Sequence, residues 1–179
     1  MIFATVGTQL PFDRLLAGLD SWAARNRDVP ILAQTGASTR RFAHIRTLRD
    51  LPQAEFLARF RAARLIVAHA GMGTILSAAE LGKPVILMPR RAKFGEHRND
   101  HQQDTAREMA RLSNVTVVED GEALHAALDR ARAMGFEAPS TAISAGPAFD
   151  PLIDAIREFV WSGAPVRPAP AMASRSRAA

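Results

Sequence analysis

The fold is decided by one stretch of the chain, Leu65-Ile66-Val67-Ala68-His69-Ala70-Gly71-Met72-Gly73-Thr74. The first four residues form an unbroken apolar run, which is typical of a strand buried on both faces of a parallel sheet. Two glycines follow, and apolar residues then recur at helical spacing from Thr74 to Leu81, where Gly82 ends the pattern. The stretch therefore predicts a strand, a turn and a helix, with the turn at the carboxyl end of the strand.

The same alternation of short apolar runs and longer amphipathic segments extends in both directions from this stretch. Further strands are expected at residues 2–6, 31–33, 42–48, 85–88 and 115–118, of which 42–48 has the weakest pattern. Further helices are expected at residues 13–25, 54–63, 99–112, 122–132 and 152–161. Apolar strands separated by helices predict an α/β fold, a Rossmann-like parallel sheet with helices on both faces.

Composition excludes several classes of function. The 179-residue chain contains no Cys, so disulfides, thiolate catalysis and cysteine-based zinc sites are excluded. Aromatic residues make up 6% and Tyr is absent, which leaves little for the base stacking used in nucleic-acid binding. The net charge of +5 falls to +2 without Arg167, Arg175 and Arg177, so the fold itself is not strongly basic and no nucleic-acid partner is expected.

The chain is expected to hold one domain, residues 1–162, followed by a tail. Residues 163–179 combine Pro, Ala and Arg without any apolar period, which predicts a disordered basic tail. No apolar run approaches the roughly 20 residues that span a bilayer, and the first residues lack the basic part of a signal peptide. These observations predict a cytoplasmic protein.

Two glycine-containing turns are the first candidates for a binding site. Each follows an expected strand and precedes an expected helix, and their residues are Gly7, Thr8, Gly71, Met72, Gly73 and Thr74. Ligands of open α/β sheets bind at the carboxyl ends of strands, where glycines and a helix N-terminus let backbone N–H groups approach a phosphate. The alternative for each turn taken alone is a tight turn that merely requires glycine, because a lone G-x-G is a weak signal.

A third candidate stretch, Pro89 to Gln102, follows the expected strand 85–88. Its cationic side chains, which would suit a diphosphate or an anionic sugar, are Arg90, Arg91, Lys93 and Arg98. Asn99 and His101 add neutral hydrogen-bonding groups, as does Gln102 itself, and a solvated basic loop is the alternative interpretation. His97 and His101 lie four residues apart, but no third ligand accompanies them, so no metal site is expected.

Four ordered blocks of sequence carry a resemblance to a known family. They are Thr5-Val6-Gly7-Thr8-Gln9 with Phe12-Asp13, then His69-Ala70-Gly71-Met72-Gly73-Thr74, then Gly82-Lys83-Pro84, then Asn99-Asp100-His101-Gln102. Over residues 1–132 they resemble the C-terminal, nucleotide-sugar-binding half of family 28 glycosyltransferases. More narrowly, the chain is similar to stand-alone cytosolic subunits, as in the dolichol-linked N-acetylglucosaminyltransferase and bacterial exopolysaccharide glucuronosyltransferases.

The resemblance implies a function for the whole chain. It implies half of a GT-B glycosyltransferase, which binds a UDP-sugar (UDP-GlcA or UDP-GlcNAc) for transfer to a lipid-linked acceptor in polysaccharide biosynthesis. A separate membrane-anchored subunit would supply the acceptor half and recruit this chain to the inner face of the membrane. No metal or other cofactor is implied.

The resemblance also implies roles by position. Residues 71–74 would form the turn that faces the diphosphate, His101 and Gln102 would face the sugar or the phosphates, and Gly7 and Thr8 would line the cleft. On the resulting hypothesis of a glycosyltransferase subunit, the Gly71 turn and Arg90, Arg91 or Arg98 would stabilise the charge that develops on the departing UDP.

Two roles stay open at the level of the sequence. Many relatives have a Glu that holds the ribose where this chain has Ser77, and Glu80 lies one turn later, so either residue is a candidate for that contact. The weak candidates for the catalytic base are His69, Asp13 and His97, each with a structural or substrate-positioning role as the alternative. The base otherwise lies on a partner chain.

Two other functions are consistent with the fold. One is a non-catalytic nucleotide-binding regulatory module, because a fold alone does not establish an activity. The other is an NAD-dependent oxidoreductase, which is disfavoured because Leu76 replaces the third glycine of G-x-G-x-x-G and no acidic residue follows about 20 residues on. The sequence names neither the donor sugar, nor the acceptor, nor the stereochemical outcome.

Overall fold

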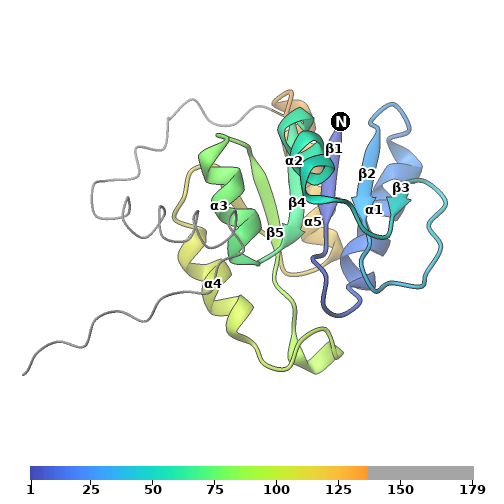
Figure 1. Ribbon diagram of the computed structural model, residues 1–179. Helices are drawn as coiled ribbons and strands as arrows, with labels where there is room; N and C mark the ends of the chain where they lie inside the picture. Colours follow the sequence, from blue (N-terminus) through green and yellow to red (C-terminus); the bar gives the residue numbers. More distant parts are fainter. Residues whose placement is uncertain (137–179) are drawn as a thin grey trace, which may run out of the picture. The chain divides into compact units, whose positions relative to one another are not determined.

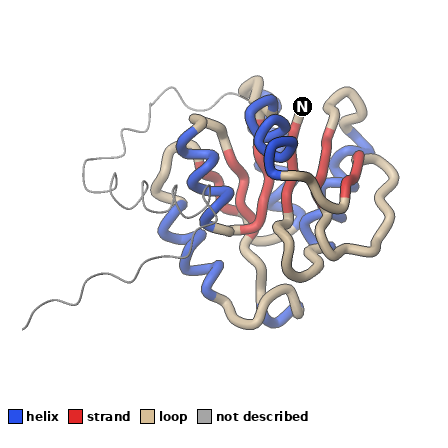
Figure 2. The backbone as a smooth tube through the Cα atoms, viewed as in Figure 1, coloured by secondary structure: helices blue, strands red, loops and turns tan. Residues whose placement is uncertain are grey.

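The computed structural model describes residues 1–136, which form a six-stranded sheet between two layers of helices (Figures 1 and 2). The strands are β1 (Ile2–Thr5), β2 (Ile31–Gln34), β3 (Arg46–Leu48), β4 (Leu65–His69), β5 (Val85–Met88) and β6 (Val115–Val117). All of them pair in parallel, in the order β3-β2-β1-β4-β5-β6. The predicted α/β class with a Rossmann-like parallel sheet is therefore confirmed.

Five α-helices and one short 3₁₀ helix lie within the described range, and the last of them follows the final strand. They are α1 (Asp13–Arg25), α2 (Gln53–Ala62), α3 (Met72–Glu80), η1 (Ala92–Phe94), α4 (His101–Met109) and α5 (Gly121–Ala133). Apolar residues of α1 and α5 pack on one face of the sheet, and those of α2, α3 and α4 pack on the other. The helices therefore cover both faces, as the unbroken apolar strands predict.

Each face of the sheet has its own hydrophobic core, because successive side chains of a strand point to opposite faces. In β1, Ile2 and Ala4 join the core beneath α1 and α5, whereas Phe3 joins the core beneath α2 and α3. Phe3 packs edge-on against Phe60 of α2, with ring centroids 6.3 Å apart. All four residues of β1 are therefore buried, as expected for a strand in the centre of a sheet that is covered on both faces.

Most predicted elements begin and end within three residues of the observed ones, and β3 shows the largest difference. Helix α1 and strand β5 have the predicted bounds, but β3 is confined to Arg46–Leu48 rather than residues 42–48. The Asp20 side chain of α1 accepts the backbone N–H groups of His44 and Ile45, at 2.6 and 3.2 Å. Those N–H groups are therefore not available to a strand ladder, and the strand begins only after them.

Some predictions concern a part of the chain that the structure does not describe. The expected helix at residues 152–161 and the domain boundary after residue 162 both lie outside residues 1–136. Among the residues that are described, no helix is both long enough and apolar enough to cross a membrane.

Candidate functional site

The carboxyl ends of β1 and β4 meet where the strand order changes direction, since the chain runs from β1 to β3 on one side and from β4 to β6 on the other. Ligands of open α/β sheets bind at such a switch point. Thr5 at the end of β1 is paired in register with Ala68 of β4. The two predicted glycine turns, at Gly7 and at Gly71, therefore lie side by side at this point.

The imidazole of His69 fills the space between the two turns. A Cβ atom added to Gly7 would lie 2.9 Å from His69 Cε1, and one added to Gly71 would overlap His69 Nε2. Gly7 also has φ = +72°, a left-handed conformation that favours glycine. Both glycines are thus required by the fold, and their proximity depends on the flat ring between them.

The same environment keeps the His69 ring neutral. Burial, and next the positive charge of Arg90, lower the pKa of His69 from 6.5 to about 4, although a hydrogen bond with the backbone of Thr5 acts in the opposite direction. Desolvation disfavours the charged form of an imidazole, and a nearby cation adds to that effect. His69 is therefore uncharged at neutral pH.

Gly73, one residue after Met72 in the first turn of α3, has a different environment. A Cβ atom added there would have no neighbour within 4 Å, so the packing of the described residues does not require glycine at this position. Gly71 is the N-cap of α3, and no side chain caps this end of the helix. The helix thus presents its N-terminal turn at the switch point without a capping side chain, beside an open space over Gly73.

Arg90 lies after β5 and is only 2% exposed. Its guanidinium donates four hydrogen bonds to backbone carbonyls, at 2.7 Å to Val6 and to Leu10 and at 2.9 Å to Pro11 and to Glu96. Both terminal nitrogens are therefore occupied by the protein itself. The structure gives Arg90 a role in holding loops, where the sequence predicted a contact with the donor.

Arg14 and Glu96 form an ion pair beside Arg90. Arg14 Nε and one terminal nitrogen donate to the two carboxylate oxygens of Glu96 at 2.8 and 2.9 Å, and Arg14 also donates to the carbonyls of Pro89 and Glu119. Neither residue was predicted from the sequence. They are 82 positions apart, and no local pattern marks an ion pair at that separation.

Two further arginines of the β5–α4 segment differ in their surroundings. Arg91 forms an ion pair with Glu119, and its Nε atom is buried without a hydrogen-bond partner among residues 1–136. Arg98 is exposed. Of the three predicted arginines, Arg91 and Arg98 are thus the two whose guanidinium groups are not enclosed by backbone carbonyls.

The start of α4 brings together the predicted neutral side chains. The rings of His97 and His101 lie edge-on with centroids 4.5 Å apart, and Asn99 hydrogen-bonds His101 Nδ1. His97 Nδ1 is buried without a partner among the described residues. Gln102 is 5% exposed and accepts the backbone N–H of Arg90 at 3.1 Å, so it supports the Arg90 backbone.

The remaining predicted residues have defined places. Asp13, in the first turn of α1, accepts a hydrogen bond from Ser38 of the β2–β3 loop, and Thr8 is exposed in the β1–α1 loop. Thr74 is buried in α3, and the Ser77 hydroxyl donates to the Gly73 carbonyl at 2.9 Å, within its own helix. Glu80 is in the last turn of α3, about 12 Å along the helix from Met72 at 1.5 Å per residue.

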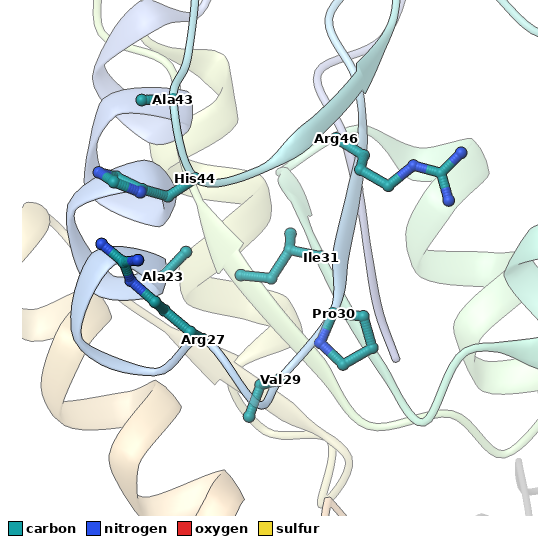
Figure 3. A pocket seen from close by; sticks show the side chains of 8 residues that line it. All are labelled: Ala23, Arg27, Val29, Pro30, Ile31, Ala43, His44 and Arg46. Carbon is teal, nitrogen blue, oxygen red and sulfur yellow. The ribbon is translucent and has the colours of Figure 1, made fainter.

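A pocket of about 280 Å³ lies elsewhere, at the amino end of β2 (Figure 3). Its lining residues are Ala23, Arg27, Val29, Pro30, Ile31, Ala43, His44 and Arg46. In Figure 3 the Arg46 side chain extends away from Arg27 and His44, so these groups do not converge on one point. The pocket thus lies where strand β2 begins, whereas Gly7 and Gly71 follow the carboxyl ends of β1 and β4, at the opposite end of the strands.

Comparison with known proteins points to one family. Residues 1–149 match the family model of the glycosyltransferase family 28 C-terminal domain. A segment of 69 residues is 39% identical to the UDP-N-acetylglucosamine--N-acetylmuramyl-(pentapeptide) pyrophosphoryl-undecaprenol N-acetylglucosamine transferase of Solibacter usitatus, covering 38% of this chain and 18% of that protein.

Solved structures share the fold. Acinetobacter baumannii MurG superposes with a TM-score of 0.59 at 19% identity, over 87% of this chain and 49% of that one. ALG13 superposes with a TM-score of 0.57 at 19% identity, over 85% of this chain and 94% of that one. The chain thus spans about half the length of the MurG structure and nearly the full length of the ALG13 structure.

Proposed function

The chain belongs to the glycosyltransferase family 28 C-terminal domain family, and we propose that it is the donor-binding subunit of a two-component glycosyltransferase. It binds a UDP-sugar, either UDP-GlcA or UDP-GlcNAc, whose sugar passes to a lipid-linked acceptor in polysaccharide biosynthesis. The name of the Solibacter usitatus relative supports this, since that protein transfers N-acetylglucosamine to a pyrophosphoryl-undecaprenol acceptor.

The observation that carries the proposal is the uncapped N-terminus of α3 beside the open space over Gly73. Backbone N–H groups at a helix N-terminus, together with the helix dipole, attract a phosphate. A diphosphate over Gly73 would use this end of α3 as it leaves the sugar, because negative charge develops there in the transition state. Met72 and Thr74 flank that position, and Gly7 and Thr8 supply the neighbouring loop.

The cationic and neutral groups of the β5–α4 segment complete this donor site. Arg91 and Arg98 carry the positive charge toward the diphosphate, while Asn99 and His101 present hydrogen-bonding groups on the exposed surface. The buried, unpartnered atoms Arg91 Nε and His97 Nδ1 support a ligand here, because buried polar groups are nearly always hydrogen-bonded. The residue that holds the ribose stays unassigned between Ser77 and Glu80.

The catalytic base is proposed to come from the partner. A general base works best when its pKa is near the working pH, and the pKa of His69 is about 4. Asp13 is engaged by the Ser38 hydroxyl, and the His97 ring lies against His101. None of the three is therefore well placed to deprotonate an acceptor hydroxyl.

Exposed apolar side chains support a partner at the same edge of the sheet. Leu10, Leu48, Met72 and Phe94 are each between 37% and 53% exposed, and each lies at or after the carboxyl end of a strand. Exposed apolar groups that gather in one region are typical of an interaction surface. We propose that a membrane-anchored subunit with the acceptor site covers this edge and brings the chain to the inner face of the membrane.

Co-expression with a neighbouring glycosyltransferase-like reading frame tests the proposal. Membranes that hold both chains are expected to transfer labelled sugar from UDP-GlcA or UDP-GlcNAc to a lipid acceptor, and the purified chain alone is expected to bind UDP without transfer. Robust transfer by the chain alone would overturn the two-component arrangement. Absence of UDP binding would overturn the donor site.

A further inference from the structure

Arg90 connects two loops that border the proposed donor site but belong to different parts of the chain. Three of its four carbonyl partners, Val6, Leu10 and Pro11, belong to the segment between β1 and α1, which includes Gly7. The fourth partner, Glu96, belongs to the segment between β5 and α4. One guanidinium therefore fixes the distance between these two loops.

This arrangement needs the shape of arginine as well as its charge. A guanidinium presents its donors in a rigid planar fork, whereas a lysine ammonium is a single point with three donors. The two terminal nitrogens of Arg90 each serve two carbonyls, at 2.7 to 2.9 Å. A lysine at this position could keep the charge but not the four bonds.

The guanidinium is itself held from several sides. Its carbon lies 4.7 Å from the centroid of the fully buried Phe12 ring, and Gln102 accepts the Arg90 backbone N–H. Glu96, which is bound by Arg14 from α1, supplies the negative charge nearby. Burial lowers the pKa of Arg90 while Glu96 acts against that shift, and an arginine stays charged in either case.

We propose that Arg90 is a positioning residue for the donor site: it holds the β1–α1 loop, with Gly7, in the conformation that the UDP-sugar requires. The inference rests on the proposed function. Gly7 lies against the His69 ring, which in turn lies against Gly71 at the start of α3. A displacement of the β1–α1 loop would therefore shift the His69 ring, and the ring would in turn shift the turn at Gly71 that is proposed to face the diphosphate.

The test compares Arg90→Lys and Arg90→Ala with the wild-type chain. Three measurements are made: the thermal midpoint, the Kd for UDP by calorimetry, and hydrogen exchange of the backbone amides. Arg90→Lys is expected to raise the Kd for UDP at least tenfold, with faster exchange confined to residues 6–12 and 89–96. Low-millimolar guanidinium ion is expected to restore UDP affinity to Arg90→Ala, while methylammonium is not. Arg107→Lys, an exposed arginine paired with Asp104 on α4, is the matched control.

Each outcome decides the question. A lower thermal midpoint with unchanged UDP affinity in the folded variants would show a role in stability alone and overturn the inference. Unchanged exchange in both loops would overturn it as well. If Arg90→Ala does not fold, Arg90→Lys and Arg14→Met decide by the same measurements; Arg14→Met removes the hydrogen bonds to Pro89 and Glu96 and so loosens the β5–α4 segment from outside. A wild-type chain that binds no uridine nucleotide overturns the proposed function, and the exchange data then still show whether Arg90 holds the loops.

Discussion

Gly71 and Gly73 are two residues apart and meet opposite surroundings. A Cβ atom at position 71 would overlap the His69 ring, whereas one at position 73 would meet nothing within 4 Å. The first glycine is therefore explained by packing, and the second is not. A bound diphosphate that approaches the backbone closely would explain the second.

Gly73→Val is expected to fold with a stability within about 1 kcal/mol of the wild type, because valine is no worse than glycine in a helix. The same variant is expected to lose UDP binding, because its side chain occupies the space over the turn. Gly71→Ala is the matched variant, expected to lose about 1–3 kcal/mol through overpacking. Urea unfolding and calorimetry with UDP measure both effects, and normal UDP affinity in Gly73→Val would remove this turn from the site.

His69 makes the stability of the domain depend on pH. Its pKa is about 4 in the folded chain, against the ordinary value of 6.5 in an unfolded chain, so the unfolded chain binds the proton more tightly. Its contribution is present above pH 6.5 and is lost as the pH falls toward 4. We expect this group alone to make the domain about 2 kcal/mol less stable at about pH 5 than at about pH 7.5.

Urea unfolding at the two pH values measures this difference, and His69→Asn provides the reference. The variant removes the titrating ring, so its stability is expected to fall by about 2 kcal/mol less than that of the wild type over the same interval. Equal pH dependence in the two proteins would show that His69 does not carry the effect.

At this scale the sequence locates the turns but not the roles of single side chains. The positions of Gly7 and Gly71 follow from glycine after a buried strand, and the structure brings the two turns together. Arg90 was expected to face the donor, since an arginine in a basic loop has the same local pattern whether it binds a ligand or backbone carbonyls. Only the fold shows which carbonyls surround it.

At the scale of the elements, the helices differ in how they begin. Within residues 1–136, α5 is the one α-helix whose N-cap side chain, that of Asp120, accepts a backbone N–H from its own first turn, that of Ala123, at 2.8 Å. The N-termini of α3 and α4, which border the proposed donor site, have no side-chain cap. Helices α1 and α2 also lack a side-chain cap, so the missing cap alone does not mark the site; what distinguishes α3 is the open space over Gly73 beside its first turn.

Asp120→Ala is expected to cost about 1 kcal/mol of unfolding free energy, the usual value of an N-cap. UDP affinity is expected to be unchanged, because α5 packs beneath the opposite face from α3. Thermal unfolding with a parallel UDP titration measures both. A weakened UDP affinity would show that α5 contributes to the donor site.

Elements with a strong period were predicted well, and those that depend on distant partners were not. Helix α1 repeats apolar residues on one face and has the expected bounds. Strand β3 is shorter than expected because Asp20 of α1 takes two backbone N–H groups, and η1 was not expected at all. The Asp100 side chain accepts the Ala92 N–H where η1 begins, a contact that no short-range pattern reveals.

At the scale of the whole molecule, the fold class alone would also suit a dinucleotide enzyme. The strand order is the one found in dinucleotide-binding sheets, with the switch point between β1 and β4. Membership of the glycosyltransferase family favours the proposed UDP-sugar instead, whereas the open turn at Gly73 would accept the diphosphate of either ligand. The two possibilities differ in which ligand stabilises the domain.

UDP, UDP-GlcA and UDP-GlcNAc are expected to raise the thermal midpoint, and NAD is expected to leave it unchanged. A ligand at a hundred times its Kd stabilises the folded state by about 2.7 kcal/mol, and such an effect is readily measured. Parallel thermal scans with each nucleotide provide the comparison. Stabilisation by NAD and not by UDP would favour the oxidoreductase and contradict the donor site.

The ring of His69 between Gly7 and Gly71 also constrains how this sequence can diverge. Alanine at position 71 destabilises the fold only while the His69 ring occupies the space that the alanine methyl group needs. The loss of stability therefore depends on which residue is at position 69. A library that varies position 71 alone should return glycine, whereas one that also replaces His69 with a smaller residue should accept alanine. Positions 69 and 71 are thus coupled, whereas Gly7 is also held by its positive φ, and a path that replaces Gly71 must first replace His69.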